Sequence, residues 1–315
     1  MMKRFKHPEQ TVAGIILLAL CLLTAVLAPQ LSPPADPGAP EVFKVVGRST
    51  DQTPHPPDEN ARLGTMPGQL DVFHLMVWGM RSAFQFGLLV VLLAGSFGVL
   101  YGAASAMLGR QGEQFLMRVA DAFMAFPLIG AVVFISQLCT LPLWGPGSFP
   151  PIAVSPWYIE SQITPFQRFM AELDPVLIAL ILFSWMSYAR MVHANVVRLK
   201  YQEYVVAARA MGANGVWVLL RHLLPNAITP AIVLAARDIG GMVVLQTTFS
   251  FIGLGASSPW GVSLNLGRAW VLGVAGNPLT YWWAFVPATL ALILFGLSWN
   301  LVGDALSDWV DPHHR

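Results

Sequence analysis

The sequence predicts an all-α membrane protein with six transmembrane helices, and its composition and its long apolar segments carry this prediction. Of 315 residues, 55% are hydrophobic and 11% are charged, with a mean hydropathy of +0.59. A soluble domain has roughly 25% charged residues. A helix needs about 20 apolar residues to cross a core of about 30 Å, and barrel strands are shorter. The segments of that helical length are Thr11–Ala28, Ala83–Leu108, Ala120–Leu143, Pro175–Val197, Ala227–Leu254 and Trp282–Val302.

The distribution of lysine and arginine predicts the orientation of these helices. One set of alternate loops holds Lys3, Arg4, Lys6, Arg110, Arg118, Arg190, Arg198, Lys200, Arg209, Arg221 and Arg315. The other set holds the smaller group Lys44, Arg48, Arg62, Arg81, Arg168 and Arg268. Because cytoplasmic loops are enriched in positive residues, both termini are expected in the cytoplasm. A net charge of +1 gives no reason to expect a nucleic-acid partner.

The chain divides into five parts on this basis. Residues 1–28 form the cytoplasmic N-terminus and first helix, although Lys3 to Lys6 and a small-residue site at Ala25–Ala28 leave a cleaved signal peptide as an alternative. Residues 29–82 are rich in proline and are expected to be external, largely extended and without a core of their own. They would either contact a substrate-binding protein or form a plain surface loop. The remaining parts are a five-helix core at 83–303, a cytoplasmic loop within it at 198–226, and a cytoplasmic tail at 304–315.

The loop before the fifth span, EYVVAARAMGANGVWVLLRHLLPN, has the pattern of a helical hairpin. Tyr204, Ala207, Ala208 and Met211 recur at helical spacing and predict one small, apolar face that another protein could approach closely. Gly212 permits a turn. We expect a second helix over Gly215–Leu224, capped by Asn214 and ended by Pro225. The resulting helix, bend and helix would form a docking element on the cytoplasmic side.

This hairpin resembles the EAA loop of ATP-binding-cassette (ABC) importer permeases, whose pattern is Glu-Ala-Ala, three residues, Gly, nine residues, an apolar residue, any residue, then Leu-Pro. Val206 stands where glutamate is usual and His222 where isoleucine is common. The wording EYV.AAR..GA and RH.LPN is similar to the dipeptide and oligopeptide permease family, second-permease (C) type. The resemblance implies an ATPase-coupling role for Glu203, Tyr204, Ala207, Ala208, Arg209, Gly212, Ala213, His222, Leu224, Pro225 and Asn226.

Five further segments resemble the same family. Leu63–Phe73 is similar to LGTD..GRDV without its Gly-Arg pair, and Leu116–Pro127 to LMR..D...AFP. Trp185–Arg190 matches W..YAR, and SFIGLG and NLVGDALSDWVDP resemble the family's SFLGLG and its C-terminal ending. Arg118 and Asp121 can pair on one helix. Pro127 within a span predicts a kink, either a moving hinge or static packing.

Arg237 and Asp238 are unusual because they lie well inside the fifth predicted span, where a charge costs roughly 2.5 to 3.5 kcal/mol. As neighbours, they point in different directions and cannot neutralise each other on one face. Two interpretations are open: at least one of them lines the transport path or pairs with a partner chain, or both lie near the cytoplasmic interface. Gln246, where many family members carry glutamate, is a further path candidate.

The resemblance implies a type I ABC importer permease fold and a peptide substrate. It further implies a second permease, two ATP-binding subunits or one fused pair, an external substrate-binding protein, and a bacterial-type inner membrane. ATP and Mg would be bound by the ATPase subunits, because the sequence contains no G-x₄-GK[ST] phosphate loop. Neither HExxH nor GxSxG occurs, so no catalytic residue, metal site or cofactor is expected on this chain. The alternatives are an ion-gradient carrier with Asp238 as its ion site, and a membrane enzyme.

Overall fold

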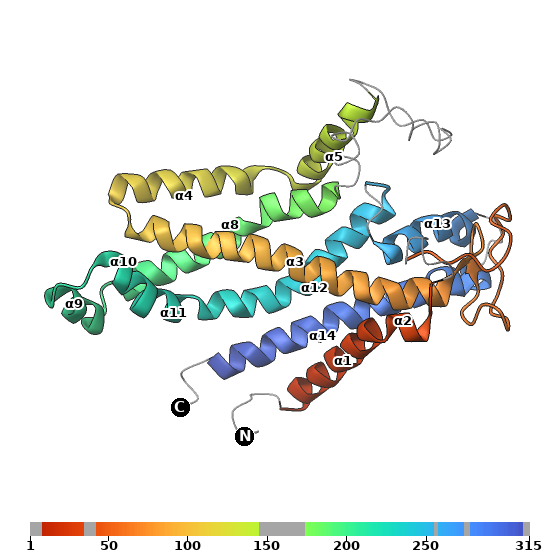
Figure 1. The fold of residues 1–315 in the computed structure, drawn as a ribbon, viewed down its shortest axis with the longest axis horizontal. Helices are drawn as coiled ribbons and strands as arrows, with labels where there is room; N and C mark the ends of the chain where they lie inside the picture. Colours follow the sequence, from red (N-terminus) through yellow and green to blue (C-terminus); the bar gives the residue numbers. More distant parts are fainter. Residues whose placement is uncertain (1–7, 35–41, 145–173, 255–257, 274–277, 311–315) are drawn as a thin grey trace.

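The computed structural model describes residues 8–34, 42–144, 174–254, 258–273 and 278–310, and helices make up most of this part (Figure 1). The α-helices are α1 (Pro8–Val26), α2 (Ala28–Leu31), α3 (Val72–Met107), α4 (Arg110–Ala125), α5 (Leu128–Trp144), α8 (Pro175–Leu199), α9 (Glu203–Ala210), α10 (Gly215–Val218), α11 (Leu224–Ala227), α12 (Thr229–Phe251), α13 (Pro259–Gly273) and α14 (Val286–Val310). A π-helical turn η2 (Leu219–Leu223), a 3₁₀-helical segment η3 (Pro278–Ala284), and strands β1 (Thr65–Met66) and β2 (Leu70–Asp71) complete the described elements.

The all-α membrane class is confirmed. Within the described residues, α1, α3, α8, α12 and α14 are each long and apolar enough to cross a membrane. The third predicted span, Ala120–Leu143, is not one continuous helix. It is divided between α4 and α5, which meet at an angle of 84° around Phe126 and Pro127. Proline has no N–H group to continue the helical ladder, and the observed bend is much sharper than the kink predicted from the sequence.

Two helices extend beyond the spans predicted from hydropathy. The second predicted span, Ala83–Leu108, corresponds to α3. This helix begins at Val72, because the Asp71 carboxylate accepts hydrogen bonds from the backbone N–H groups of Phe73 (2.9 Å) and His74 (3.4 Å). The last helix, α14, continues to Val310 instead of ending near Val302. Hydropathy marks where a membrane core ends, whereas a helix continues as long as its backbone and side-chain contacts support it.

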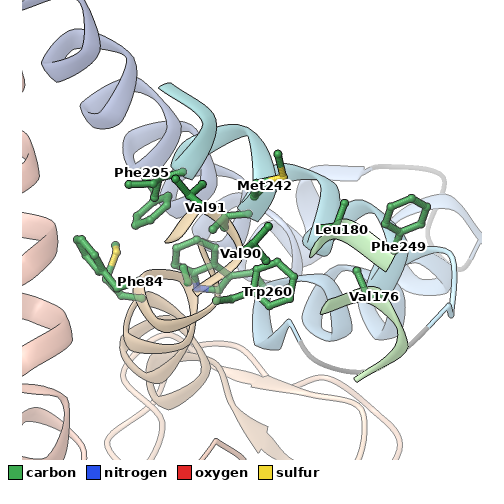
Figure 2. Close-up of a cluster of buried hydrophobic side chains, with 14 of the residues drawn as sticks. Phe84, Val90, Val91, Val176, Leu180, Met242, Phe249, Trp260 and Phe295 are labelled. Atoms are coloured by element: carbon green, nitrogen blue, oxygen red, sulfur yellow. The ribbon is translucent and has the colours of Figure 1, made fainter. Parts of the chain in front are cut away.

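The core lies around α3, which packs against α1, α8, α12, α13 and α14. Figure 2 shows the main buried cluster, in which side chains from α1, α3, α5, α8, α12, α13 and α14 meet. Its labelled members are Phe84, Val90 and Val91 of α3, Val176 and Leu180 of α8, Met242 and Phe249 of α12, Trp260 of α13 and Phe295 of α14. The rings of Phe84 and Phe295 meet edge to face with centroids 5.1 Å apart.

Residues 42–71, which we call the distal cap, correct the expectation of an extended segment without a core. Strands β1 and β2 pair antiparallel, with Thr65 opposite Asp71. Met66 and Leu75 are fully buried in a small cluster with Trp283 of η3. The cap therefore folds back on the bundle, at the end that lies away from α9 (Figure 1). Residues 145–173, which connect α5 to α8, lie outside the described residues.

Candidate functional site: a helical hairpin with an open apolar face

The first helix of the Glu203–Asn226 hairpin ends in a Schellman motif. The N–H of Ala213 bonds the carbonyl of Ala208 (3.1 Å), and the N–H of Gly212 bonds the carbonyl of Arg209 (2.9 Å). This motif requires a left-handed residue just after the helix, and Gly212 has a φ of +86°. A Cβ atom at Gly212 would meet no neighbour within 4 Å. The position therefore selects glycine for its backbone conformation and not for lack of space.

The second helix begins where the sequence predicts but does not end there. The Asn214 side chain accepts a hydrogen bond from the N–H of Val216 (3.1 Å), so the predicted cap is confirmed. Pro225 does not end the helix, because it lies in the first turn of α11, which follows a π-helical turn. In that turn the N–H of Leu224 reaches the carbonyl of Leu219. The wider turn accommodates a ring that a regular α-helix would exclude.

One face of the hairpin is buried against the bundle. Val205 and Ala208 of α9 pack with Val218 and Leu223 of the second helix. This cluster also contains Val99, Ala103 and Ala106 of α3 and Tyr188, Val192 and Val196 of α8. Ala208 is 5% exposed, which corrects its predicted place on the open face. The sequence spacing identified the helix but not which of its sides the bundle covers.

The opposite face of the hairpin is apolar and exposed. Its large side chains are Tyr204, Val206, Met211, Val216, Trp217 and Leu220, with Met211 exposed by 84%. The His222 ring lies between the two helices, with its centroid 6.1 Å from that of Tyr204 and 5.0 Å from that of Trp217. Ala207 is also exposed. Exposed apolar side chains gathered on one short element are typical of an interaction site for a protein or a membrane.

Charged and polar side chains border this apolar face. Glu203 lies in the first turn of α9 and Arg209 in its last, where each complements the helix dipole. Arg221 is exposed on η2, and the Asn226 side-chain amide donates to the carbonyl of His222 (2.7 Å). An apolar centre with a polar border is typical of protein interfaces. Of the predicted coupling residues, Ala208 is buried and the others are partly or fully exposed.

Two glycines of α3, which the sequence analysis did not single out, allow close packing of the two helices beneath the hairpin, α3 and α8. A Cβ atom at Gly98 would collide with the carbonyl oxygen of Trp185, and one at Gly102 with that of Ala189. The backbones of α3 and α8 therefore approach closely along this line. The Gly-x₃-Gly spacing was the signal available in the sequence, since small residues at this spacing allow close packing of membrane helices.

Arg237 and Asp238 point to different neighbours, as predicted. The guanidinium Nη2 of Arg237 lies 2.6 Å from Oδ1 of Asp304 on α14, and its stem crosses Gly303, where a Cβ atom would come within 2.5 Å. Asp238 accepts a hydrogen bond from the Tyr188 hydroxyl on α8 (2.7 Å). Arg237 thus ties α12 to α14, and Asp238 ties α12 to α8. A path role for either residue stays a prediction.

Polar contacts also hold α4 to its neighbours. Asp121 lies 3.3 Å from Arg190 of α8 instead of pairing with Arg118 on its own helix. His193 of α8 lies 2.9 Å from Ser105 of α3 through Nδ1 and 3.3 Å from Glu113 of α4 through Nε2. These contacts lie on the α4 side of the bend at Pro127. Among the described residues, no group of three or more His, Cys, Asp or Glu side chains could hold a metal ion.

The comparisons with known proteins point to membrane transport. Residues 95–315 match the family model described as "Binding-protein-dependent transport system inner membrane component". The chain is 33% identical over 260 residues to the nickel transport system permease protein NikC of Escherichia coli (strain K12), covering 82% of this chain and 80% of that protein. It is 26% identical to the dipeptide transport system permease protein DppC of Bacillus subtilis (strain 168) over 316 residues, 99% of this chain and 85% of that protein. It is 27% identical to the oligopeptide transport system permease protein OppC of the same organism over 320 residues, 100% of this chain and 89% of that protein.

Proposed function

Since the chain belongs to the family of binding-protein-dependent transport system inner membrane components, we propose that its Glu203–Asn226 hairpin docks on an ATPase subunit and couples ATP hydrolysis to transport. The chain is a multi-pass permease subunit of an ABC importer. Subunits of this kind are not themselves catalytic. Coupling by this hairpin is the step that the proposal adds.

The observation that carries the proposal is that the hairpin is buried on one side and exposed on the other. Val205 and Leu223 are fully buried against α3 and α8, whereas Met211 and Trp217 on the other side are largely exposed. An element that is fixed on one side and open on the other can transmit a displacement from a docked partner to the helices beneath it. The close backbone approach at Gly98 and Gly102 would carry that displacement into α3 and α8.

The proposed assembly contains the partner subunits with which permeases of this family work. They are two ATP-binding subunits or one fused pair, a second homologous permease, and an external substrate-binding protein, all in a bacterial-type inner membrane. The ATPase subunits would bind ATP and Mg, and closing around ATP would move the hairpins and switch the path between outward and inward access. Both termini and the hairpin would face the cytoplasm. The first residues of α1, the last turns of α14 and Arg237 line one shared hollow, which agrees with a common side for the two chain ends.

We propose peptides as the substrate class. The dipeptide and oligopeptide permeases align with 99% and 100% of this chain, which supports a peptide over other solutes. The similarity to a nickel permease keeps a metal cation as the competing substrate, and it covers a smaller share of the chain. Pro127, at the 84° bend between α4 and α5, is the proposed hinge.

The test is co-purification from the native membrane with two matched glycine variants. Gly212→Arg alters the hairpin at a position with φ +86°, and Gly253→Arg alters the end of α12 at φ +85°. Both glycines follow a helix, and a Cβ atom at either would meet no neighbour within 4 Å. The local backbone strain is therefore matched while the location differs.

We expect the wild type and Gly253→Arg to retain ATPase subunits that carry a phosphate loop, and Gly212→Arg to lose them. The second permease should be retained in all three samples. A hairpin variant that retains the ATPase subunits, or a wild type recovered without them, would contradict the coupling role.

A further inference from the structure

A hollow of about 200 Å³, lined by polar side chains and by Phe86, Leu89 and Leu177, lies between α3, α8 and α12, away from the hairpin and outside the site described above. Its polar side chains are Ser82 and Gln85 of α3, Asp174 at the start of α8 and Gln246 of α12. We call it the distal hollow. It sits where α8 begins and where α12 approaches its end, at the opposite end of these helices from α9 (Figure 1).

Gln85 and Gln246 are polar side chains within the otherwise apolar membrane-spanning helices α3 and α12. Gln85 is exposed on α3, and Gln246, which also lines the hollow, is only 2% exposed. Polar side chains within membrane helices almost always face the bundle interior or a water-filled cavity, and they mark substrate pathways. Each amide offers both hydrogen-bond donors and an acceptor, as a peptide group does. The lining is therefore suited to a solute that contains amide groups.

Asp174 gives the hollow a fixed negative charge. Its Oδ1 accepts hydrogen bonds from the backbone N–H groups of Val176 (2.9 Å) and Leu177 (3.3 Å), which hold the carboxylate at the start of α8. Within the part of the chain that the structure describes, no hydrogen bond or ion pair engages Oδ2. Among the described residues that line the hollow, Asp174 is the one with an ionisable side chain. One oxygen thus orients the carboxylate and the other is available to a cationic group.

We propose that the distal hollow receives the amino-terminal ammonium group of a peptide on the outer side of the membrane, with Asp174 as its counter-charge. The inference rests on the proposed importer function and adds the recognition of one end of the substrate. An ammonium–carboxylate hydrogen bond is about twice as strong as a neutral one, so it selects for charge. The exposed amide of Gln85 would bond the first peptide group. The hollow would then orient the solute as it enters the path.

The test uses the assembled importer in proteoliposomes with its binding protein and the variant Asp174→Asn. Asparagine caps a helix about as well as aspartate, so this change removes the charge and retains the cap. Asp71→Asn is the matched control, because Asp71 caps α3 by the same two-amide contact and does not line the hollow. Uptake is measured for a dipeptide with a free amino terminus and for its N-acetylated form. Each rate is expressed relative to the wild type with the same peptide, so the selectivity of the binding protein cancels.

We expect Asp174→Asn to lower kcat/KM for the free dipeptide by about tenfold, the size of one charge-assisted hydrogen bond, and to leave the N-acetylated form unchanged. Asp71→Asn should affect both peptides equally. Equal losses with Asp174→Asn, or no loss, would overturn the proposal. If the wild type does not transport the N-acetylated dipeptide, the kinetics of Asp174→Asn with the free dipeptide decide. A raised KM at unchanged kcat then supports the proposal, and a lowered kcat at unchanged KM overturns it.

Two further outcomes distinguish this inference from the proposed function. Uptake of Ni²⁺ that falls in Asp174→Asn, with peptide uptake unchanged, would assign the hollow to a metal cation and overturn the ammonium assignment. A wild-type complex that takes up no peptide in the presence of ATP would contradict the proposed substrate class before any variant is compared. If the wild type transports peptide and Asp174→Asn behaves identically, the proposed ammonium site in the distal hollow is contradicted and the proposed importer function stands.

Discussion

The hairpin at one end of the molecule and the distal cap at the other differ in how their apolar surface is covered. Residues 42–71 of the cap expose one large apolar side chain, Val45, and bury Met66 completely. The hairpin is shorter and exposes Tyr204, Val206, Met211, Val216, Trp217 and Leu220. Both elements pack one side on the bundle. The cap covers most of its apolar surface and the hairpin does not, which supports the proposal that a partner binds at the hairpin.

The bonding within the two elements shows the same difference. In the cap, the N–H of Thr65 bonds the carbonyl of His55 (2.9 Å), and the Gln69 amide bonds the carbonyl of Thr53 (2.9 Å), so the chain is tied across its own turns. In the hairpin, the bonds are local caps at Gly212 and Asn214. The cap is stabilised by hydrogen bonds between its own turns, whereas the hairpin depends on packing against the bundle beneath it.

The largest expected effect comes from disrupting the close contact between α3 and α8 beneath the hairpin. Gly102→Leu places a side chain against the backbone of Ala189, where neither helix can move aside cheaply. Overpacking typically costs 1 to 3 kcal/mol, and a clash with backbone should cost about 3 kcal/mol or more. Gly296→Ala is the control, since its Cβ atom would meet nothing within 4 Å. We expect a strong loss of monodisperse protein in detergent for Gly102→Leu only, and normal yield would contradict the packing role.

The second expected effect compares buried leucines of the two elements. Leu223 of the hairpin and Leu75 beneath the cap are both 0% exposed. Removing either side chain to alanine should cost about 2 to 5 kcal/mol of unfolding free energy. Thermal unfolding in detergent measures that loss. Only Leu223→Ala should also lower transport-coupled ATPase activity in the assembled importer. Equal effects of both variants on coupling would remove the distinction between the two ends.

The third expected effect tests the open faces. Trp217→Asp on the hairpin and Val45→Asp on the cap both place a charge on an exposed apolar position. Neither should change the unfolding temperature much, because both side chains already contact water. We expect Trp217→Asp to weaken binding of the ATPase subunit by about tenfold or more, as for an interface aromatic anchor. Titration of purified ATPase onto the permease pair measures it, and an unchanged affinity would exclude Trp217 from the interface.

The smallest expected effect compares the helix caps of the two elements. Asn214→Ala removes the cap of α10, and Asp71→Ala removes that of α3. Each loss should cost about 1 kcal/mol locally. Hydrogen exchange should rise in the hairpin for Asn214→Ala, because α10 is short, and should stay low along the long α3. Unchanged exchange around Val216 would show that packing alone holds the second helix.

Much of this architecture could be predicted from the sequence because it depends on local chemistry. The long apolar segments, the Gly212 turn and the Asn214 cap each follow from the properties of a few consecutive residues. One local rule gave the wrong result, since Pro225 does not end its helix because a π-helical turn before it accommodates the ring. The kink predicted at Pro127 is present, and its angle of 84° is a property of the packing that the sequence did not give.

By itself, the sequence determined the membrane class, the helical hairpin and the residues that form it, since hydropathy and spacing act along the chain. Only the tertiary structure decided which side of each element is covered. Ala208 is buried and Ala207 is open, Arg237 meets Asp304 and Asp238 meets Tyr188, and Asp174 joins Gln85 and Gln246 at one hollow. These pairings depend on how α3, α8, α12 and α14 pack together, and residues far apart in sequence carry no local signal of that packing.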